Sequence, residues 1–149
     1  MESDLEKAIS EIDFQLHQFS PVQQDISELE GLVERDIMII EILNQQGQMT
    51  VTQIAEAFPC ASESTISTAI TGLWRERELV SKKRDDQNQR TRIIELTDKG
   101  KKAIEELYKQ RANKFQVLFE TIQITEEERQ ILLKILTRAK IFFQQPSQK

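Results

Sequence analysis

The residue types that carry most enzymatic chemistry are scarce in this sequence. The chain of 149 residues has one histidine, His17, and one cysteine, Cys60. The sequence contains no Ser/His/acid pattern, no Cys/His spacing typical of zinc sites and no glycine-rich phosphate loop. Its carboxylates are numerous, but we expect them on solvent-exposed helical faces. We therefore predict a protein that is not an enzyme and needs no metal or cofactor.

The polar residues that suggest a function lie in residues 62–78, which have helical spacing. Four apolar residues at i, i+3, i+4 and i+7 are expected to face the core: Ile66, Ala69, Ile70 and Leu73. The opposite face carries short hydroxyl side chains and one acid: Glu63, Ser64, Ser67, Thr68 and Thr71. Such a face could enter a DNA major groove, where hydroxyls contact phosphates or base edges. The alternative is an ordinary surface helix rich in Ser and Thr.

Basic residues gather directly after this helix, although the whole chain has a net charge of -5. Residues 79–84 and 91–96 are predicted as antiparallel strands joined by a polar turn at 85–89. Their cationic side chains could contact the phosphate backbone or the minor groove: Lys82, Lys83, Arg84, Arg90 and Arg92. The alternative is a solvated hairpin whose lysines prevent edge-to-edge association. DNA binding requires a local positive surface, not a positive total.

The elements around these residues are predicted to be mostly helical. A short helix from Thr50 through Phe58 and a turn at residues 59–61 precede the helix capped by Ser62, which is a helix-turn-helix pattern. Thr97 is expected to cap a long helix after the hairpin. Capping boxes mark three helix starts, at Ser20–Gln23, Thr50–Gln53 and Thr125–Glu128. The predicted fold class is mostly α with a small β-hairpin wing, a winged helix-turn-helix with N- and C-terminal dimerisation helices.

The terminal helices carry apolar stripes that one winged-helix core cannot cover. We predict a helical dimerisation region at residues 1–46 and 103–149 and a DNA-binding lobe at 47–102, forming one continuous structural unit. A two-fold homodimer is the commonest oligomer, and it would place the two helices about 34 Å apart, one turn of DNA. The expected interface residues are Leu5, Ile9, Ile12, Leu16, Phe19, Phe115, Leu118, Phe119, Ile122, Leu132, Ile135, Ala139 and Phe142.

The sequence resembles the MarR family of winged helix-turn-helix transcription regulators over residues 32–100. The matching segments are Met49–Ala55, Ser62–Ser67 followed by Leu73 and Leu79-Val80, and Asn88–Arg90 followed by Glu95–Gly100. The resemblance implies a homodimer on a pseudo-palindromic operator, most often acting as a repressor. It implies that Arg90 enters the minor groove. It also implies that the recognition-helix contacts include Ser62, Ser64, Thr65, Ser67 and Thr68.

The sequence departs from the family at two positions. The family usually has an aspartate two residues before the wing arginine, where this chain has Asn88, which accepts a hydrogen bond but brings no charge. Asp85 or Asp86 could orient Arg90 instead. The family also often has a threonine helix cap where this chain has Val33. The resemblance further implies a small phenolic or lipophilic effector that binds between the dimer helices and the DNA-binding lobe and releases the DNA.

Three single residues receive structural interpretations, each beside a functional alternative. Cys60 is expected as a small buried thiol, with a redox switch as the alternative. His17 is expected at the surface or at an interface. Trp74 is expected to cover the core where its helix meets the hairpin or the long helix, with ligand stacking as the alternative.

The sequence also bears on location and on a second interpretation of the fold. It shows neither a signal peptide nor an apolar run long enough to span a membrane, so we expect no membrane partner and a cytoplasmic location. A winged helix can also serve as a protein–protein interaction module without DNA binding. The pI near 5.1 keeps that alternative open.

Overall fold

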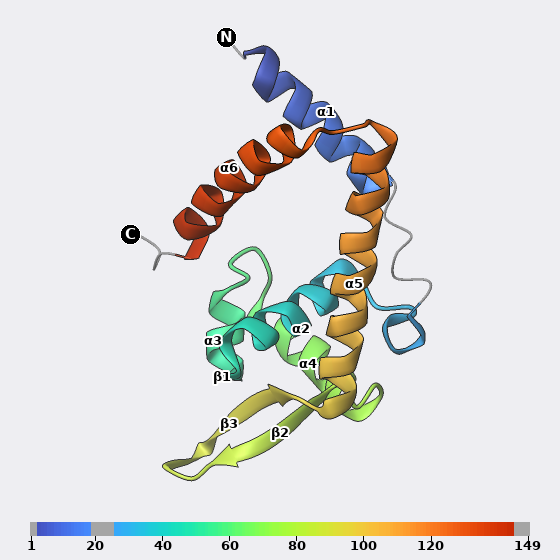
Figure 1. Cartoon of the computed structure of the whole chain (residues 1–149). Coiled ribbons are helices and arrows are strands. Elements are labelled where there is room, and N and C mark those ends of the chain that lie inside the picture. The colour runs from blue at the N-terminus through green and yellow to red at the C-terminus, as the bar shows by residue number, and fades with distance from the viewer. Residues whose placement is uncertain (1–2, 19–25, 145–149) are drawn as a thin grey trace. The chain divides into compact units, whose positions relative to one another are not determined.

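The computed structural model describes residues 3–18 and 26–144 and is mostly helical (Figure 1). The chain divides into two compact units, Met1–Gln110 and Arg111–Lys149. The helices are α1 (Asp4–Gln18), α2 (Glu34–Gln46), α3 (Val51–Glu56), α4 (Glu63–Arg75), α5 (Asp98–Thr121) and α6 (Glu126–Gln144), with a short 3-10 turn η2 (Ser27–Leu29) before α2. Within the described ranges, every helix is too short or too polar to cross a lipid bilayer.

A three-stranded antiparallel sheet lies next to the helices of the first unit. Its strands are β1 (Gln48–Thr50), β2 (Val80–Asp85) and β3 (Asn88–Leu96), in the order β1-β3-β2. The predicted hairpin is therefore confirmed, with a shorter turn than expected and a register shift between Arg84 and Asp85. The prediction missed β1, because three residues have no alternating pattern of their own. This strand forms only through its pairing with β3, where Met49 lies opposite Ile94.

The hydrophobic core of the first unit is built from α2, α3, α4, the sheet and the first turns of α5. The predicted inner face of α4 is confirmed, since Ile66, Ile70 and Leu73 are fully buried and Ala69 packs against them. The apolar run of α2 also supplies core residues, but Met38 on the same helix is 48% exposed. One face of α4 is therefore buried in the core, and the opposite face is exposed to solvent.

The capping signals in the sequence mark the helix starts correctly wherever the structure describes them. Thr50 Oγ1 accepts from the Gln53 N–H at 3.1 Å, while Gln53 Oε1 accepts from the Thr50 N–H at 2.9 Å. Ser62 Oγ accepts from the Thr65 N–H at 3.1 Å. Thr125 and Glu128 form the same reciprocal pair. The box expected at Ser20–Gln23 lies outside the described residues.

Two helices end earlier than predicted. The first, α3, ends at Glu56, not at Phe58. The second, α4, ends at Arg75, and Glu78, expected to be helical, has a φ of +57°. A left-handed residue ends a helix because it turns the chain away from the helical path. Here it leads directly into β2.

The start of α5 is fixed tightly against the start of β2. The Leu79 carbonyl accepts from the Thr97 N–H at 3.1 Å, and the Glu78 carbonyl accepts from Thr97 Oγ1 at 2.7 Å. Thr97 Oγ1 also accepts from the Gly100 N–H at 3.1 Å, so Thr97 caps α5 as predicted. A Cβ on Gly100 would clash with the Leu79 carbonyl oxygen. This close approach explains why the segment Thr97–Gly100 contains a glycine.

The terminal helices expose most of the apolar side chains that were expected at a dimer interface, whereas Leu16 and Leu132 are half-buried. Neither α1 nor α6 has a buried residue. Leu5 on α1 is 69% exposed and Phe142 on α6 is 70% exposed. Phe19, the last residue of the expected α1 stripe, lies outside the described residues. Dimerisation itself stays a prediction.

Candidate nucleic-acid interface

The outward face of α4 carries the predicted hydroxyl side chains, and several of them already make hydrogen bonds within the helix. Thr68 Oγ1 donates to the Ser64 carbonyl at 2.9 Å, and Thr71 Oγ1 donates to the Ser67 carbonyl at 3.0 Å. With their protons engaged, these threonine oxygens are left as acceptors. The Ser64 and Ser67 hydroxyls have no hydrogen-bond partner among the described residues. Both therefore remain able to donate to a partner.

The first turn of α4 uses two of the predicted contact residues in its cap. Ser62 Oγ lies 2.7 Å from Thr65 Oγ1 and also accepts from the Thr65 N–H. Glu63 is exposed beside them, in the first turn, where an acid is favourable to the helix dipole. Ser62 and Thr65 thus contribute to helix stability, whatever else they contact.

The hydroxyl face is open and shallowly hollowed. A depression runs along it, lined by Ser64, Ser67, Thr68, Thr71, Gly72 and Glu76. Short side chains and a glycine leave the helix backbone accessible over about two turns. Such a surface can approach a groove closely, because all the residues that line it except Glu76 are small.

One face of the hairpin is buried in the core at its base and carries arginines further out. Strand residues alternate between faces, so Lys82, Arg84 and their cross-strand partners Ile94 and Arg92 share one face. Ile94 is fully buried, whereas Arg84 is exposed and lies directly opposite Arg92. Like charges opposite each other destabilise a strand pair. A bound anion between or beside them would relieve that repulsion.

The other face of the hairpin is electrically balanced. Lys83 Nζ lies 2.7 Å from Glu95 Oε1, and Gln48 Nε2 donates to Glu95 Oε2 at 2.9 Å. The hydrogen bonds from Lys83 and Gln48 hold the pKa of Glu95 below its ordinary value. The hydrogen bond to Glu95 and its charge raise the pKa of Lys83. The structure therefore separates Lys83 from the other basic residues predicted as DNA contacts, and pairs it with an acid.

The tip of the hairpin shows which groups surround the predicted wing arginine. Asn88 Oδ1 accepts from the Arg90 N–H at 3.1 Å, so it orders the backbone and not the guanidinium. Asp85 Oδ1 accepts from the Gln87 N–H at 3.0 Å. Arg92 Nη1 donates to the Gln89 carbonyl at 2.8 Å. In the described part of the chain, neither Asp85 nor Asp86 forms an ion pair with Arg90.

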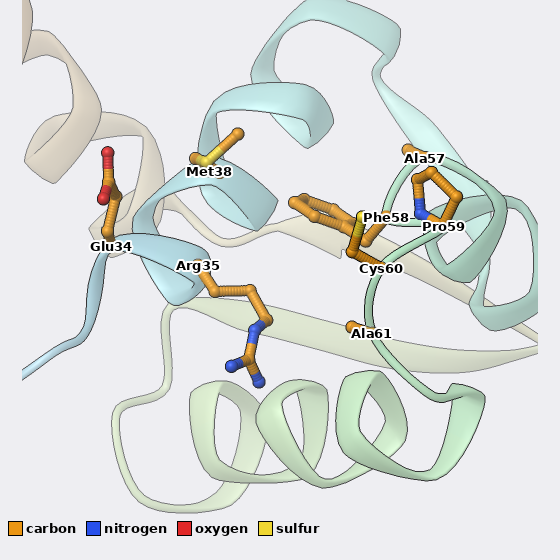
Figure 2. Close-up of a pocket in the computed structure, with 8 residues that line it drawn as sticks. All are labelled: Glu34, Arg35, Met38, Ala57, Phe58, Pro59, Cys60 and Ala61. Atoms are coloured by element: carbon orange, nitrogen blue, oxygen red, sulfur yellow. The ribbon is translucent and has the colours of Figure 1, made fainter.

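The prediction of a buried Cys60 is wrong, because its thiol is exposed. Figure 2 shows Cys60 with Phe58 on the turn between α3 and α4, facing the first turns of α2 across an open hollow. The hollow measures about 440 Å³ and is lined by Glu34, Arg35, Met38, Ala57, Phe58, Pro59, Cys60 and Ala61. Cys60 lies on the turn between two helices, where Pro59 is exposed as well. General burial statistics for free cysteines therefore fail here.

The other two singled-out residues lie where they were expected. His17 is exposed, and its Nδ1 lies 2.9 Å from the Asp13 carbonyl, which together with the Asp13 carboxylate raises the pKa of His17. Trp74 packs partly buried against the core, with Lys82 of the hairpin above its ring. No group of three or more His, Cys, Asp or Glu side chains suited to a metal ion occurs among the described residues.

Comparison with known proteins finds the likeness in structure and not in sequence. No family model and no curated protein matches the chain. The crystal structure of RV1404 from Mycobacterium tuberculosis matches with a TM-score of 0.75 and 15% identity, over 100% of both chains. A mutant of S. aureus MepR bound to an oligodeoxyribonucleotide matches with a TM-score of 0.65 and 24% identity, over 96% of this chain and 100% of that chain. MarR matches with a TM-score of 0.65 and 20% identity, over 93% of this chain and 96% of that chain.

These matches define the class of protein as a winged helix-turn-helix, with α3 and α4 as its helix pair and β2 and β3 as its wing. More particularly, the chain has the MarR-type winged-helix fold, and the match covers 93–96% of the chain. The resemblance seen in the sequence is thereby confirmed at the level of the fold.

Proposed function

We propose that this chain is a non-enzymatic transcription regulator that binds double-stranded DNA sequence-specifically as a homodimer on a pseudo-palindromic operator. One observation carries the proposal: α4 exposes a face of short hydroxyl side chains next to a hairpin that places Arg84 opposite Arg92. A groove-entering helix flanked by cations that contact phosphate combines direct readout with backbone positioning. The structural likeness to a MepR mutant bound to an oligodeoxyribonucleotide supports the same function.

The distribution of charge supports DNA as the partner despite the acidic total. The net charge of -5 opposes association with a polyanion at long range. The arginines of the hairpin provide the local attraction, because Arg90 has no ion-pair partner in the described part of the chain. The other hairpin face, with Lys83 and Glu95, is neutral overall. We therefore expect DNA to approach the arginine-bearing face.

Dimerisation is part of the proposal, because a single copy leaves too much apolar surface exposed. On α1, Leu5, Ile9 and Ile12 are all more than half exposed. In the second unit, Ile122 and Phe142 are exposed to 62% and 70%. A patch of this kind on a water-soluble chain marks an interaction site. Sedimentation velocity should give a species of twice the chain mass, and a stable monomer at micromolar concentration would refute this part.

The binding test uses the full-length chain and the region upstream of its own gene. Fluorescence anisotropy with that duplex, measured at two salt concentrations, should show saturable binding that weakens as salt rises. A shuffled duplex of equal length serves as the control and should bind more weakly at both concentrations. Equal affinity for both duplexes would remove sequence specificity, and no binding to either would overturn the proposal.

The competing candidate is a winged-helix module that binds proteins and not DNA. The observation in its favour is the pI near 5.1. This candidate predicts that the arginine-bearing hairpin face is not needed for partner binding, and that the protein does not bind duplex DNA even at low salt. The anisotropy measurement at the lower salt concentration therefore separates the two candidates.

The finer features of the proposed regulator follow from the same resemblance. We propose that it acts as a repressor in the cytoplasm and that a small phenolic or lipophilic effector releases it from DNA. The hollow beside Arg35, Met38 and Phe58 offers apolar walls and a cation within the first unit. Substituting Met38 by Trp should fill it and abolish an effector response while DNA binding persists. An undiminished response would place the effector elsewhere.

A further inference from the structure

The last turn of α4 and the hairpin meet at Trp74, the only tryptophan in the sequence. Its side chain is half-buried and packs against the core. Lys82 Nζ on β2 lies 5.3 Å from the centroid of the ring system, and the Arg75 guanidinium carbon lies 4.9 Å from it. Both distances fall within the roughly 6 Å over which an aromatic face attracts a cation. One ring therefore links α4 with the first half of the hairpin.

Lys82 is the last position on its face of β2 that borders the core. Its cross-strand partner Ile94 is fully buried, and Lys82 itself is half-buried. Two residues further along the same face, Arg84 pairs with Arg92, and Arg84 is exposed. The Trp74–Lys82 contact thus joins α4 to this face at the point where the strand leaves the core. Beyond it, every hydrogen bond made by a side chain of residues 84–92 joins two residues of that segment.

We propose that Trp74 is a positioning residue that fixes, through Lys82, the direction of the hairpin relative to α4. The purpose of this contact rests on the proposed function, because a helix and a hairpin can contact one duplex together only in a limited range of relative orientations. When two binding elements are held rigidly, the second binds as if at high local concentration. A hairpin that swings freely loses that advantage, although each element still carries its own binding groups.

The chemistry of the contact distinguishes this role from simple filling of the core. A leucine would occupy apolar space beside the core but would not attract the Lys82 ammonium. A phenylalanine keeps an aromatic face, although a smaller one that attracts cations less than an indole does. Lys82→Met keeps the length and apolar stem of the side chain and removes only the charge. Lys109→Met removes an exposed lysine of α5 and serves as the matched control.

The first measurement is made on the free full-length protein, without DNA. Backbone amide relaxation by NMR should show more motion in residues 85–91 for Trp74→Leu and for Lys82→Met, and an intermediate effect for Trp74→Phe. In Lys109→Met, the amide relaxation of the hairpin should be the same as in the wild type. In Lys82→Met, the single tryptophan should also become more accessible to acrylamide quenching. Should Trp74→Leu fail to fold, the milder variant Lys82→Met decides the question alone.

The second measurement is DNA affinity across salt concentrations. Trp74→Leu should bind the operator about two- to five-fold more weakly, in line with the loss of one cation–π contact, and with a smaller salt slope. The inference would be overturned if the hairpins of Trp74→Leu and Lys82→Met were as rigid as that of the wild type, and if Trp74→Phe and Trp74→Leu behaved alike. If the wild-type protein binds no duplex but the free hairpins loosen as expected, the proposed function fails and the positioning role stands.

Discussion

The two ends of the β2–β3 hairpin are built in opposite ways. We call residues 79–83 and 93–97 the neck and residues 84–92 the tip. The neck is bonded to other elements, through Glu95 to Gln48, through Thr97 to Glu78 and through Lys82 to Trp74, and the Lys83–Glu95 ion pair joins its two strands. The side chains of the tip hydrogen-bond only within the tip. We infer that changes in the neck alter stability, whereas changes in the tip alter binding and leave stability almost unchanged.

The largest expected effect is in the support of the neck, at Gly100. Gly100→Ala should lower the free energy of unfolding by about 3 kcal/mol, the upper end of what overpacking costs, because the new Cβ meets the Leu79 carbonyl oxygen. Urea denaturation followed by circular dichroism measures the change. Gly72→Ala is the matched control, since its Cβ would meet nothing within 4 Å, and it should gain about 0.5–1 kcal/mol. Equal behaviour of both variants would contradict the close approach.

The next effect is in the tip and should appear in binding alone. Arg90→Ala should weaken operator binding about tenfold and reduce the salt slope by about one, as expected for the loss of one cationic contact with the duplex, with an unchanged unfolding midpoint. Lys83→Ala should change affinity much less, because its ammonium already pairs with Glu95 at 2.7 Å. Anisotropy titrations over a range of salt measure both. Equal losses for the two variants would contradict the distinction between the tip and the neck of the hairpin.

A smaller effect, of opposite sign, is expected at Glu78. Its φ of +57° is costly for a residue with a side chain, so Glu78→Gly should stabilise the protein by about 1 kcal/mol. Glu78→Gln keeps the strain while removing the charge, so it should not share the gain. Thermal unfolding distinguishes the two variants. A gain that appears equally in both would assign the effect to charge and not to backbone conformation.

The sequence predicted those parts of the fold that depend on local patterns. Capping at Thr50, Ser62 and Thr97 and the inner face of α4 follow from short-range spacing, and the structure has them. The missed features depend on contacts between distant segments. Strand β1 exists only through its pairing with β3, and the helix ends at Arg75 because Glu78 turns left-handed towards the neck.

The candidate site shows the same limit. Alternation along β2 alone places Lys82 and Lys83 on opposite faces, but it does not say which lysine meets an acid. That answer requires the register between β2 and β3. The shift between Arg84 and Asp85 prevents this register from being predicted from the sequence. The role of Asn88 was likewise open, and its oxygen turns to the backbone N–H of Arg90. Which residues contact DNA stays a prediction that the variants above test.

The smallest effect concerns the ion pair in the neck and depends on pH. Hydrogen bonds from Lys83 and Gln48 hold the pKa of Glu95 below its ordinary value of 4.5. A carboxyl group with a lowered folded-state pKa stabilises the fold above its unfolded pKa, and this contribution is lost as the pH falls through the folded value. Glu95→Gln should therefore cost at most about 1 kcal/mol near pH 7, as for partly exposed pairs.

Chemical denaturation of the wild type and Glu95→Gln at pH 7 and pH 3 tests this expectation, with exposed Glu105→Gln as the control. The difference between wild type and Glu95→Gln should shrink at pH 3, because this pH lies below the ordinary carboxyl pKa of 4.5 and the stabilisation from the ionised, hydrogen-bonded form is lost as the pH falls. The free energy of unfolding of Glu105→Gln should stay close to that of the wild type at both pH values. A Glu95→Gln difference that persists undiminished at pH 3 would mean that packing, and not the charge of the neck, sets the contribution of this side chain.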